Sequence, residues 1–208
     1  MMLYRSVFKE ASVEQVIERS RFIAHIRPVE SREEAETFFS RIRTEHKGAT
    51  HNVPAFVFGA KGEHQWASDD GEPQGTAGAP MLQLLIKEDL ANVAVIVTRY
   101  FGGTKLGTGG LARAYTSSAK LAIEASGICR VMEVDVICGR LEYSHFERLK
   151  STQDEVAFQI REVNYADRVT VTILVDPEKR KQLEDLIAEL TGGSFQPLSL
   201  QQERVKIS

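Results

Sequence analysis

Several residue types and patterns that would mark a specialised protein are scarce in this sequence. Its 208 residues include two cysteines and one tryptophan, and no run approaches the ~20 apolar residues of a membrane-spanning helix. Cys129 and Cys138 lack a CxxC pattern or a histidine spacing, so they are interpreted as reduced core residues rather than a disulfide framework. The first residues also lack the apolar core of a signal peptide. These absences predict a cytoplasmic protein without a membrane segment.

A strong excess of basic residues is missing as well. Lys and Arg number 26 against 29 Asp and Glu, a formal net charge of −3, which argues against a strongly basic nucleic-acid-binding protein but allows a local basic patch. Residues 1–130 hold 16 basic and 15 acidic side chains, and the remainder hold 10 and 14. Any nucleic-acid role is therefore expected in the first part. The 42% hydrophobic content suits one large or two small folded domains.

The stretch from residue 93 to 127 predicts a strand, a glycine-rich loop and a helix. Residues 93–97 form an unbroken β-branched apolar run, which is typical of a central strand covered on both faces. Five glycines follow between residues 102 and 110, where the backbone can take positive φ and approach other groups closely. Small and apolar residues then recur at helical spacing until Gly127, which is expected to end the helix.

This loop at a helix N-terminus is a candidate anion site. Free N–H groups and the positive end of the helix dipole favour an anion, and basic side chains lie nearby. The candidates are Arg99, Lys105, Gly107, Thr108, Gly109, Gly110 and Arg113. The loop does not match a Walker A motif, and it is too long for a dinucleotide fingerprint. Three interpretations stay open: close backbone packing, a nucleotide pocket, or a surface that binds nucleic acid or protein.

A second loop, SDDGEPQGTAGAP, carries three carboxylates within four residues. Asp69, Asp70 and Glu72 could bind a divalent cation or act as acid and base, although the spacing is not that of an EF-hand and Asp-Gly is first of all a turn signal. Gly75 and Thr76 then lead through Pro80 into a helix. If both loops meet, they form either one concave polar surface or an ion-pair network of Asp69 and Asp70 with Arg99.

The rest of the N-terminal part predicts ordinary elements. Alternating residues within 13–29 indicate an antiparallel strand pair, and Ser31 with Glu34 forms a capping box before a helix that ends near residues 47–48. A hairpin is expected from residues 54–59 and 64–68. A helix with the apolar residues Leu82, Leu85 and Ile86 is expected after Pro80.

The part after Gly127 predicts strands and helices in the order βαββαβ, the ferredoxin-like arrangement. Such a scaffold hosts many functions and proves none. Its sheet could bind RNA on the open face, but it lacks an RNP-like pair of aromatic residues, so base stacking is not assigned to it.

The two loops together resemble the signature of the YigZ/IMPACT family. The matching segments are SDDGEPQGTAGAPML and VTRYFGGTKLGTGGLARAY, and the resemblance covers essentially the whole chain. It implies an α+β protein with an N-terminal domain, 1–130, like a ribosomal-protein second domain and domain IV of elongation factor G, and a ferredoxin-like domain, 131–208, like domain V of that factor. It also implies a role around translation. No catalytic residues are established for the family to carry over.

We therefore expect a translation-associated regulatory protein, not an enzyme. It is expected to bind RNA, the ribosome or a ribosome-associated protein through the face that carries the glycine-rich loop. No cofactor or metal is expected, and the oligomeric state is left open. One alternative is a nucleotide- or phosphate-binding enzyme, since LGTGGLARAYTSSA faintly resembles the phosphate loop of small-molecule kinases. It lacks their preceding proline and has Gly-Gly where a serine would stand. A metal-dependent hydrolase using Asp69, Asp70 and Glu72 is the other alternative.

Overall fold

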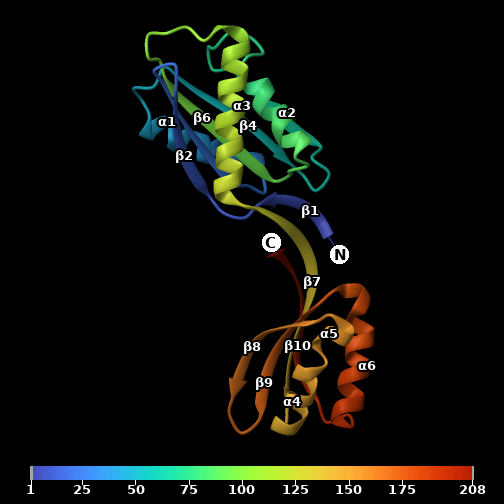
Figure 1. Cartoon of the computed structure of the whole chain (residues 1–208). Helices are drawn as coiled ribbons and strands as arrows, with labels where there is room; N and C mark the ends of the chain where they lie inside the picture. Colours follow the sequence, from blue (N-terminus) through green and yellow to red (C-terminus); the bar gives the residue numbers. More distant parts are fainter. Residues whose placement is uncertain (1, 208) are drawn as a thin grey trace. The chain divides into compact units, whose positions relative to one another are not determined.

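The computed structural model describes residues 2–207, which divide into two compact α+β units (Figure 1). The N-terminal unit consists of residues 4–130 and 206–207, and the C-terminal unit of residues 2–3 and 131–205. No helix in the described range is both long and apolar enough to cross a bilayer.

The N-terminal unit is built on a five-stranded sheet with β6 (Val93–Tyr100) at its centre. The strand order is β2-β3-β6-β4-β5, and all neighbours are antiparallel. The other strands are β2 (Ala11–Ile17), β3 (Ser20–Pro28), β4 (His51–Phe58) and β5 (His64–Ala67). Strand β6 is buried from Val93 to Arg99, which confirms the predicted central strand. The antiparallel pair and the β4–β5 hairpin are confirmed as well.

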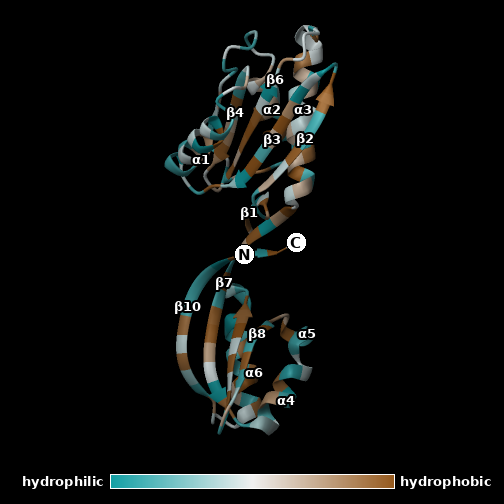
Figure 2. Cartoon of the chain, turned by 90° about the vertical axis from the view of Figure 1, so that its left-hand side faces the viewer, coloured by the Kyte–Doolittle hydropathy of each residue, from teal (hydrophilic) through white to brown (hydrophobic). Residues whose placement is uncertain are grey.

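Helices cover both faces of this sheet. Helix α1 (Arg32–Glu45) packs on the face that carries Ala94 and Ile96, whereas α2 (Gly78–Lys87) and α3 (Gly107–Ser126) pack on the face that carries Val95 and Val97. Successive residues of a strand point to opposite faces, so one apolar run supplies both cores. Figure 2 shows α1 and α3 on opposite sides of the strands.

Two details go beyond the expectations. In α2 the buried residues include Met81, Leu84 and Leu85, while Ile86 is 37% exposed, so the expected helix is present and Ile86 lies outside its buried face. The apolar stripe of α2 runs from Met81 to Leu84 and Leu85, three and four residues further along the helix. Ile86 therefore points away from this stripe. Helix α3 begins at Gly107, so three of the five glycines lie in its first turn and not in a loop.

The C-terminal unit has the predicted βαββαβ order. Its elements are β7 (Ile128–Leu141), α4 (Tyr143–Ser151), α5 (Gln153–Val156), β8 (Gln159–Tyr165), β9 (Val169–Val175), a 3-10 turn (Pro177–Lys179), α6 (Arg180–Thr191) and β10 (Gln196–Ile207). Strand β7 pairs with β9 and β10, and β8 pairs with β9, while β1 (Met2–Val7) is also hydrogen-bonded to β7. The order β10-β7-β9-β8 is that of a ferredoxin-like sheet.

The core of this unit lies between one face of the sheet and the helices. Val169, Val171 and Ile173 are buried with Phe146 of α4 and Leu183 of α6. The residues between them on β9 therefore face the opposite side of the sheet.

Candidate functional site

The acidic loop meets the end of β6, just before the glycine-rich segment, through a buried ion pair inside the N-terminal unit. Nη1 of Arg99 donates to Oε1 of Glu72 at 2.6 Å, and the two side chains are 6% and 4% exposed. The hydroxyl of Tyr115, in α3, donates to the same oxygen at 2.7 Å. Nη2 of Arg99 also donates to Oγ of Ser20 at 3.3 Å. Of the three carboxylates in the acidic loop, Glu72 is therefore the one that pairs with Arg99.

Aromatic side chains surround the Arg99–Glu72 pair and enclose its two charges within the protein. The guanidinium of Arg99 lies 5.5 Å from the ring centroid of Phe22 and 5.4 Å from that of Phe101. Burial raises the pKa of Tyr115, and its hydrogen bond to Glu72 raises that pKa further, so the phenol stays a neutral donor. The positive charge of Arg99 is thus neutralised by Glu72 and is not presented to an external anion.

Asp69 and Asp70 bind backbone groups of the same unit. The Asp69 carboxylate accepts hydrogen bonds from the N–H groups of Gly75, Ala77 and Gly78 at 2.7, 3.0 and 2.9 Å. Burial acts to raise the pKa of Asp69, but these three bonds outweigh it and hold the pKa below its usual value. Asp69 thereby caps the start of α2 from a distant position.

Asp70 and Thr76 of the acidic loop also bind groups within the N-terminal unit. Oδ2 of Asp70 accepts from the N–H of Asn52 at 2.6 Å, and the hydroxyl of Thr76 donates to the carbonyl of Pro73 at 2.6 Å. Within residues 2–207, no three His, Cys, Asp or Glu side chains are grouped so that they could hold a metal ion. The three carboxylates face separate donors, an arrangement that gives the hydrolase alternative no support.

The glycine segment fits closely against the β2–β3 turn. A Cβ added at Gly102 would lie 1.9 Å from the carbonyl oxygen of Arg19, so only glycine allows this approach. Glu18 and Arg19 both have left-handed backbones, with φ of 45° and 66°, as a two-residue hairpin turn requires. Arg19 is exposed. No local pattern in the sequence indicates that this cation lies beside Gly102, because the contact joins segments 83 residues apart.

An exposed hollow of about 500 Å³ lies beside this segment, between the β2–β3 turn and α3. Its lining includes Lys105, Arg113, Gly110 and Glu18. Lys105 and Arg113 are exposed, and neither has an ion-pair partner in the described part of the chain. Helix α3 has neither a side-chain cap nor an acidic residue in its first turn. Its N-terminal N–H groups and dipole therefore add to the positive potential near the hollow.

The residues expected to act together are thus divided between two places. Arg99 and Glu72 are buried in one network, whereas Lys105 and Arg113 line the exposed hollow. Thr108 and Gly109 are exposed in the first turn of α3. We use the name glycine-loop face for the exposed residues Lys105, Gly107, Thr108, Gly109 and Arg113 together with Gly110.

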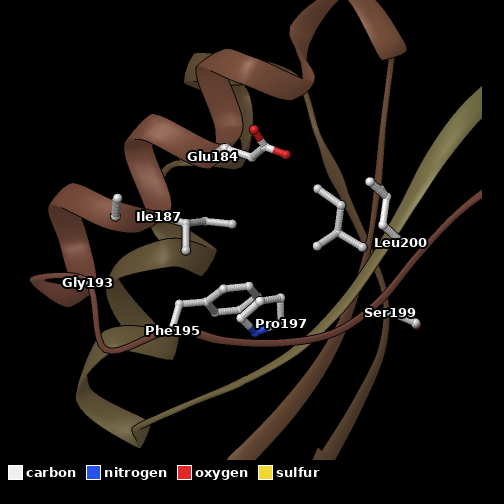
Figure 3. A pocket seen from close by; sticks show the side chains of 9 residues that line it. Glu184, Ile187, Gly193, Phe195, Pro197, Ser199 and Leu200 are labelled. Atoms are coloured by element: carbon white, nitrogen blue, oxygen red, sulfur yellow. The ribbon is translucent and has the colours of Figure 1, made fainter.

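A different kind of hollow occurs in the C-terminal unit. It has a volume of about 300 Å³ and is lined mainly by apolar groups of α6, β10 and the segment between them. Figure 3 shows the side chains of Ile187, Phe195, Pro197 and Leu200 around it, with the Glu184 carboxylate to one side. It has no basic side chain in its lining, so it offers no site for a phosphate group.

Comparison with known proteins places both units in described families. The sequence matches the Impact N-terminal domain over residues 18–123 and a domain of unknown function, DUF1949, over residues 140–194. It is 37% identical to IMPACT family member YvyE of Bacillus subtilis, covering 91% of this chain and 88% of that protein. It is 31% identical to IMPACT family member YigZ of Escherichia coli, covering 92% and 95%. A crystal structure described as a hypothetical protein aligns with a TM-score of 0.61 and 28% identity, covering 97% and 98% of the two chains.

Proposed function

The chain belongs to the IMPACT family, and from this premise we propose that it is a translation-associated regulatory protein that binds RNA phosphates through its glycine-loop face. The resemblance in the two loop motifs implies the role around translation. The RNA-binding surface is inferred from the exposed hollow, where two cations without ion-pair partners among the described residues flank the start of α3. No catalytic step is included in the proposal.

The charges of this face favour a phosphate over other ligands. Lys105 and Arg113 supply two full positive charges, and the first turn of α3 supplies N–H donors whose dipoles point the same way. Glu18 is the single acidic residue in the lining of the hollow, so the net local charge stays positive. Arg99 is excluded from the binding surface because Glu72 already neutralises it. The proposed contact therefore depends on Lys105 and Arg113.

The test is co-sedimentation of the full chain with ribosomal subunits and polysomes across a salt series. The variant is Lys105→Gln with Arg113→Gln, and the control is Lys47→Gln with Lys61→Gln, which removes the same charge from exposed positions outside the hollow. Each lost phosphate contact should reduce the slope of log K against log salt by about 0.7 to 0.9. We expect the variant, and not the control, to show twice that reduction.

Two results would contradict the proposal. If no ribosomal fraction retains the protein at low salt, direct ribosome binding is wrong, and a ribosome-associated protein becomes the partner to seek. If the control loses as much binding as the variant, the attraction comes from overall charge and not from the glycine-loop face.

One observation favours nucleotide binding as a second candidate. A hollow of about 500 Å³ falls within the size range of small-molecule sites, roughly 300 to 1,000 Å³. A ligand that binds the native state must raise its stability, so ATP with magnesium should raise the melting temperature if this candidate is right. The Lys105→Gln, Arg113→Gln variant should then lose that shift. An unchanged melting temperature in the wild type would eliminate the candidate.

A further inference from the structure

We propose that the β8–β9 end of the C-terminal unit is a second contact for single-stranded RNA, separate from the glycine-loop face. In this contact a phosphate lies in a polar hollow beside Arg140 and Arg168, and a neighbouring base stacks on the exposed ring of Tyr143 or Tyr165.

The polar hollow lies on the face of the sheet opposite the helices. Its volume is about 490 Å³, and its lining includes Arg140, Asn164, Asp167, Arg168, Thr170 and Gln196. Arg140 and Asn164 are both directly opposite Thr170 in the strand register. Since the neighbours of Thr170, Val169 and Val171, are buried with the helices, these three paired side chains share the open face.

The two arginines are available to an anion. Arg140 is exposed and Arg168 is partly exposed, and neither has an ion-pair partner within residues 2–207. Asp167 is the one acidic residue in the lining, so the hollow keeps an excess positive charge. Planar guanidinium groups form paired hydrogen bonds with phosphate oxygens, and Asn, Thr and Gln add neutral hydrogen-bonding groups.

An aromatic pair stands at the same hairpin. The rings of Tyr143 and Tyr165 are stacked with centroids 6.0 Å apart and planes 23° apart, although the two residues are 48% and 59% exposed. The hydroxyl of Tyr143 donates to the carbonyl of Ala166 at 2.7 Å, and the ring of Tyr165 meets that of Phe146 edge-on. These contacts fix two large rings that remain open to solvent.

The arginines and the tyrosines together identify the ligand class. Asn164 and residues 166–168 line the hollow, whereas Tyr165, paired with the buried Val169, lies on the other face of the same hairpin. A flexible strand that passes around this hairpin end would therefore meet the cations first and the aromatic rings next. Proteins that bind single-stranded nucleic acid combine these two elements, with the backbone on basic groups and the bases on aromatic rings. A free phosphate ion could bind the arginines, but it has no base that could stack on the tyrosines.

The test uses the full chain in the Lys105→Gln, Arg113→Gln background, so that the glycine-loop face does not contribute. Binding of a fluorescein-labelled oligouridine is followed by anisotropy across a salt series. Arg140→Gln with Arg168→Gln should reduce the slope of log K against log salt by about 1.4, the value for two phosphate contacts on a single strand. The control, Lys179→Gln with Lys181→Gln, removes equal charge from the same unit and should leave the slope unchanged.

The tyrosines are tested by a matched pair of variants. Tyr143→Leu with Tyr165→Leu should weaken binding by about five- to 150-fold, the usual range for one lost stacked base, without changing the salt slope. Tyr143→Phe with Tyr165→Phe keeps both rings and removes the bond from Tyr143 to the Ala166 carbonyl; it should bind like the parent, which would show that the rings and not the hydroxyls are needed. The proposal is overturned if the parent does not bind oligouridine at low salt. It is equally overturned if inorganic phosphate displaces the RNA while the leucine variants bind normally, because the hollow would then be a free-phosphate site.

Discussion

We expect Arg99→Leu and Glu72→Leu to destabilise the N-terminal unit by unequal amounts. Arg99→Leu leaves the Glu72 carboxylate buried without its cation, but the Tyr115 hydroxyl still donates to it. Glu72→Leu leaves the guanidinium of Arg99 buried without an anion and also removes the acceptor of the Tyr115 hydroxyl. Glu72→Leu thus leaves a buried cation whose remaining acceptor is Ser20, together with an unpaired Tyr115 hydroxyl, whereas Arg99→Leu leaves a carboxylate that still accepts from Tyr115 and lies 3.8 Å from Nε2 of His51.

The size of each effect follows from the burial of the pair. Both side chains are at most 6% exposed, so water screens the remaining charge little, and removing one partner of a buried pair costs about 3 to 5 kcal/mol. We expect Arg99→Leu near the lower end of that range and Glu72→Leu near the upper end. The double variant Arg99→Leu, Glu72→Leu holds no buried charge, so its cost should be well below the sum of the two. Either single loss is a large share of the roughly 5 to 15 kcal/mol that stabilises a typical domain.

The assay is urea unfolding followed by tryptophan fluorescence. Trp66 is the only tryptophan in the chain and lies in β5, stacked on Phe56, so its emission reports on the N-terminal unit. Linear extrapolation gives the free energy of unfolding for each variant. A cost below about 1 kcal/mol for Arg99→Leu, or fully additive losses in the double variant, would refute a buried and mutually neutralised pair.

Three further predictions concern the same unit. Asp69→Asn should lower the free energy of unfolding by about 1 kcal/mol at pH 7. In urea titrations below pH 4 the difference from the wild type should fade. The reason is that the depressed pKa of Asp69 gives stability that is lost as the pH falls through that pKa. Gly102→Ala should lower the melting temperature because its Cβ would lie 1.9 Å from the Arg19 carbonyl oxygen, whereas Gly109→Ala, with no atom within 4 Å, should raise it. Burial, and then the charge of a neighbouring histidine, lowers the pKa of His25 from 6.5 to about 4. The unfolded chain therefore takes up the proton first and the wild type loses stability between these pH values, a loss that pH-dependent urea titrations should find smaller in His25→Gln.

The parts of the fold that could be predicted from the sequence are those with a strong local pattern. The apolar run of β6, the Ser31 cap of α1 and the end of α3 at Gly127 each depend on neighbouring residues, and the structure has all three. The C-terminal strand order also followed, since the βαββαβ pattern restricts the possible topologies. In α2, where the apolar residues surround much of the helix, local pattern did not determine which of them faces the sheet.

The candidate site was harder to predict because it depends on contacts between distant segments. The sequence left open whether the acidic loop meets Arg99, and it could not show which of Asp69, Asp70 and Glu72 would turn inward. Asp69 meets the N–H groups at the start of α2, so Glu72 remains to neutralise Arg99. The stacked pair of Tyr143 and Tyr165 joins the start of a helix to a hairpin. No sequence pattern around either residue predicts this contact.

The buried pair changes how binding data for this protein must be interpreted. Arg99 and Glu72 lie in the two segments that carry the family resemblance, yet their charges neutralise each other within the N-terminal unit. An Arg99 variant that no longer binds RNA would therefore be expected even if Arg99 never touched RNA, because part of the protein would be unfolded. Lys105 and Arg113 are exposed, so their replacement should change binding and leave the urea midpoint in place. Only a loss of binding at constant stability is evidence for the glycine-loop face.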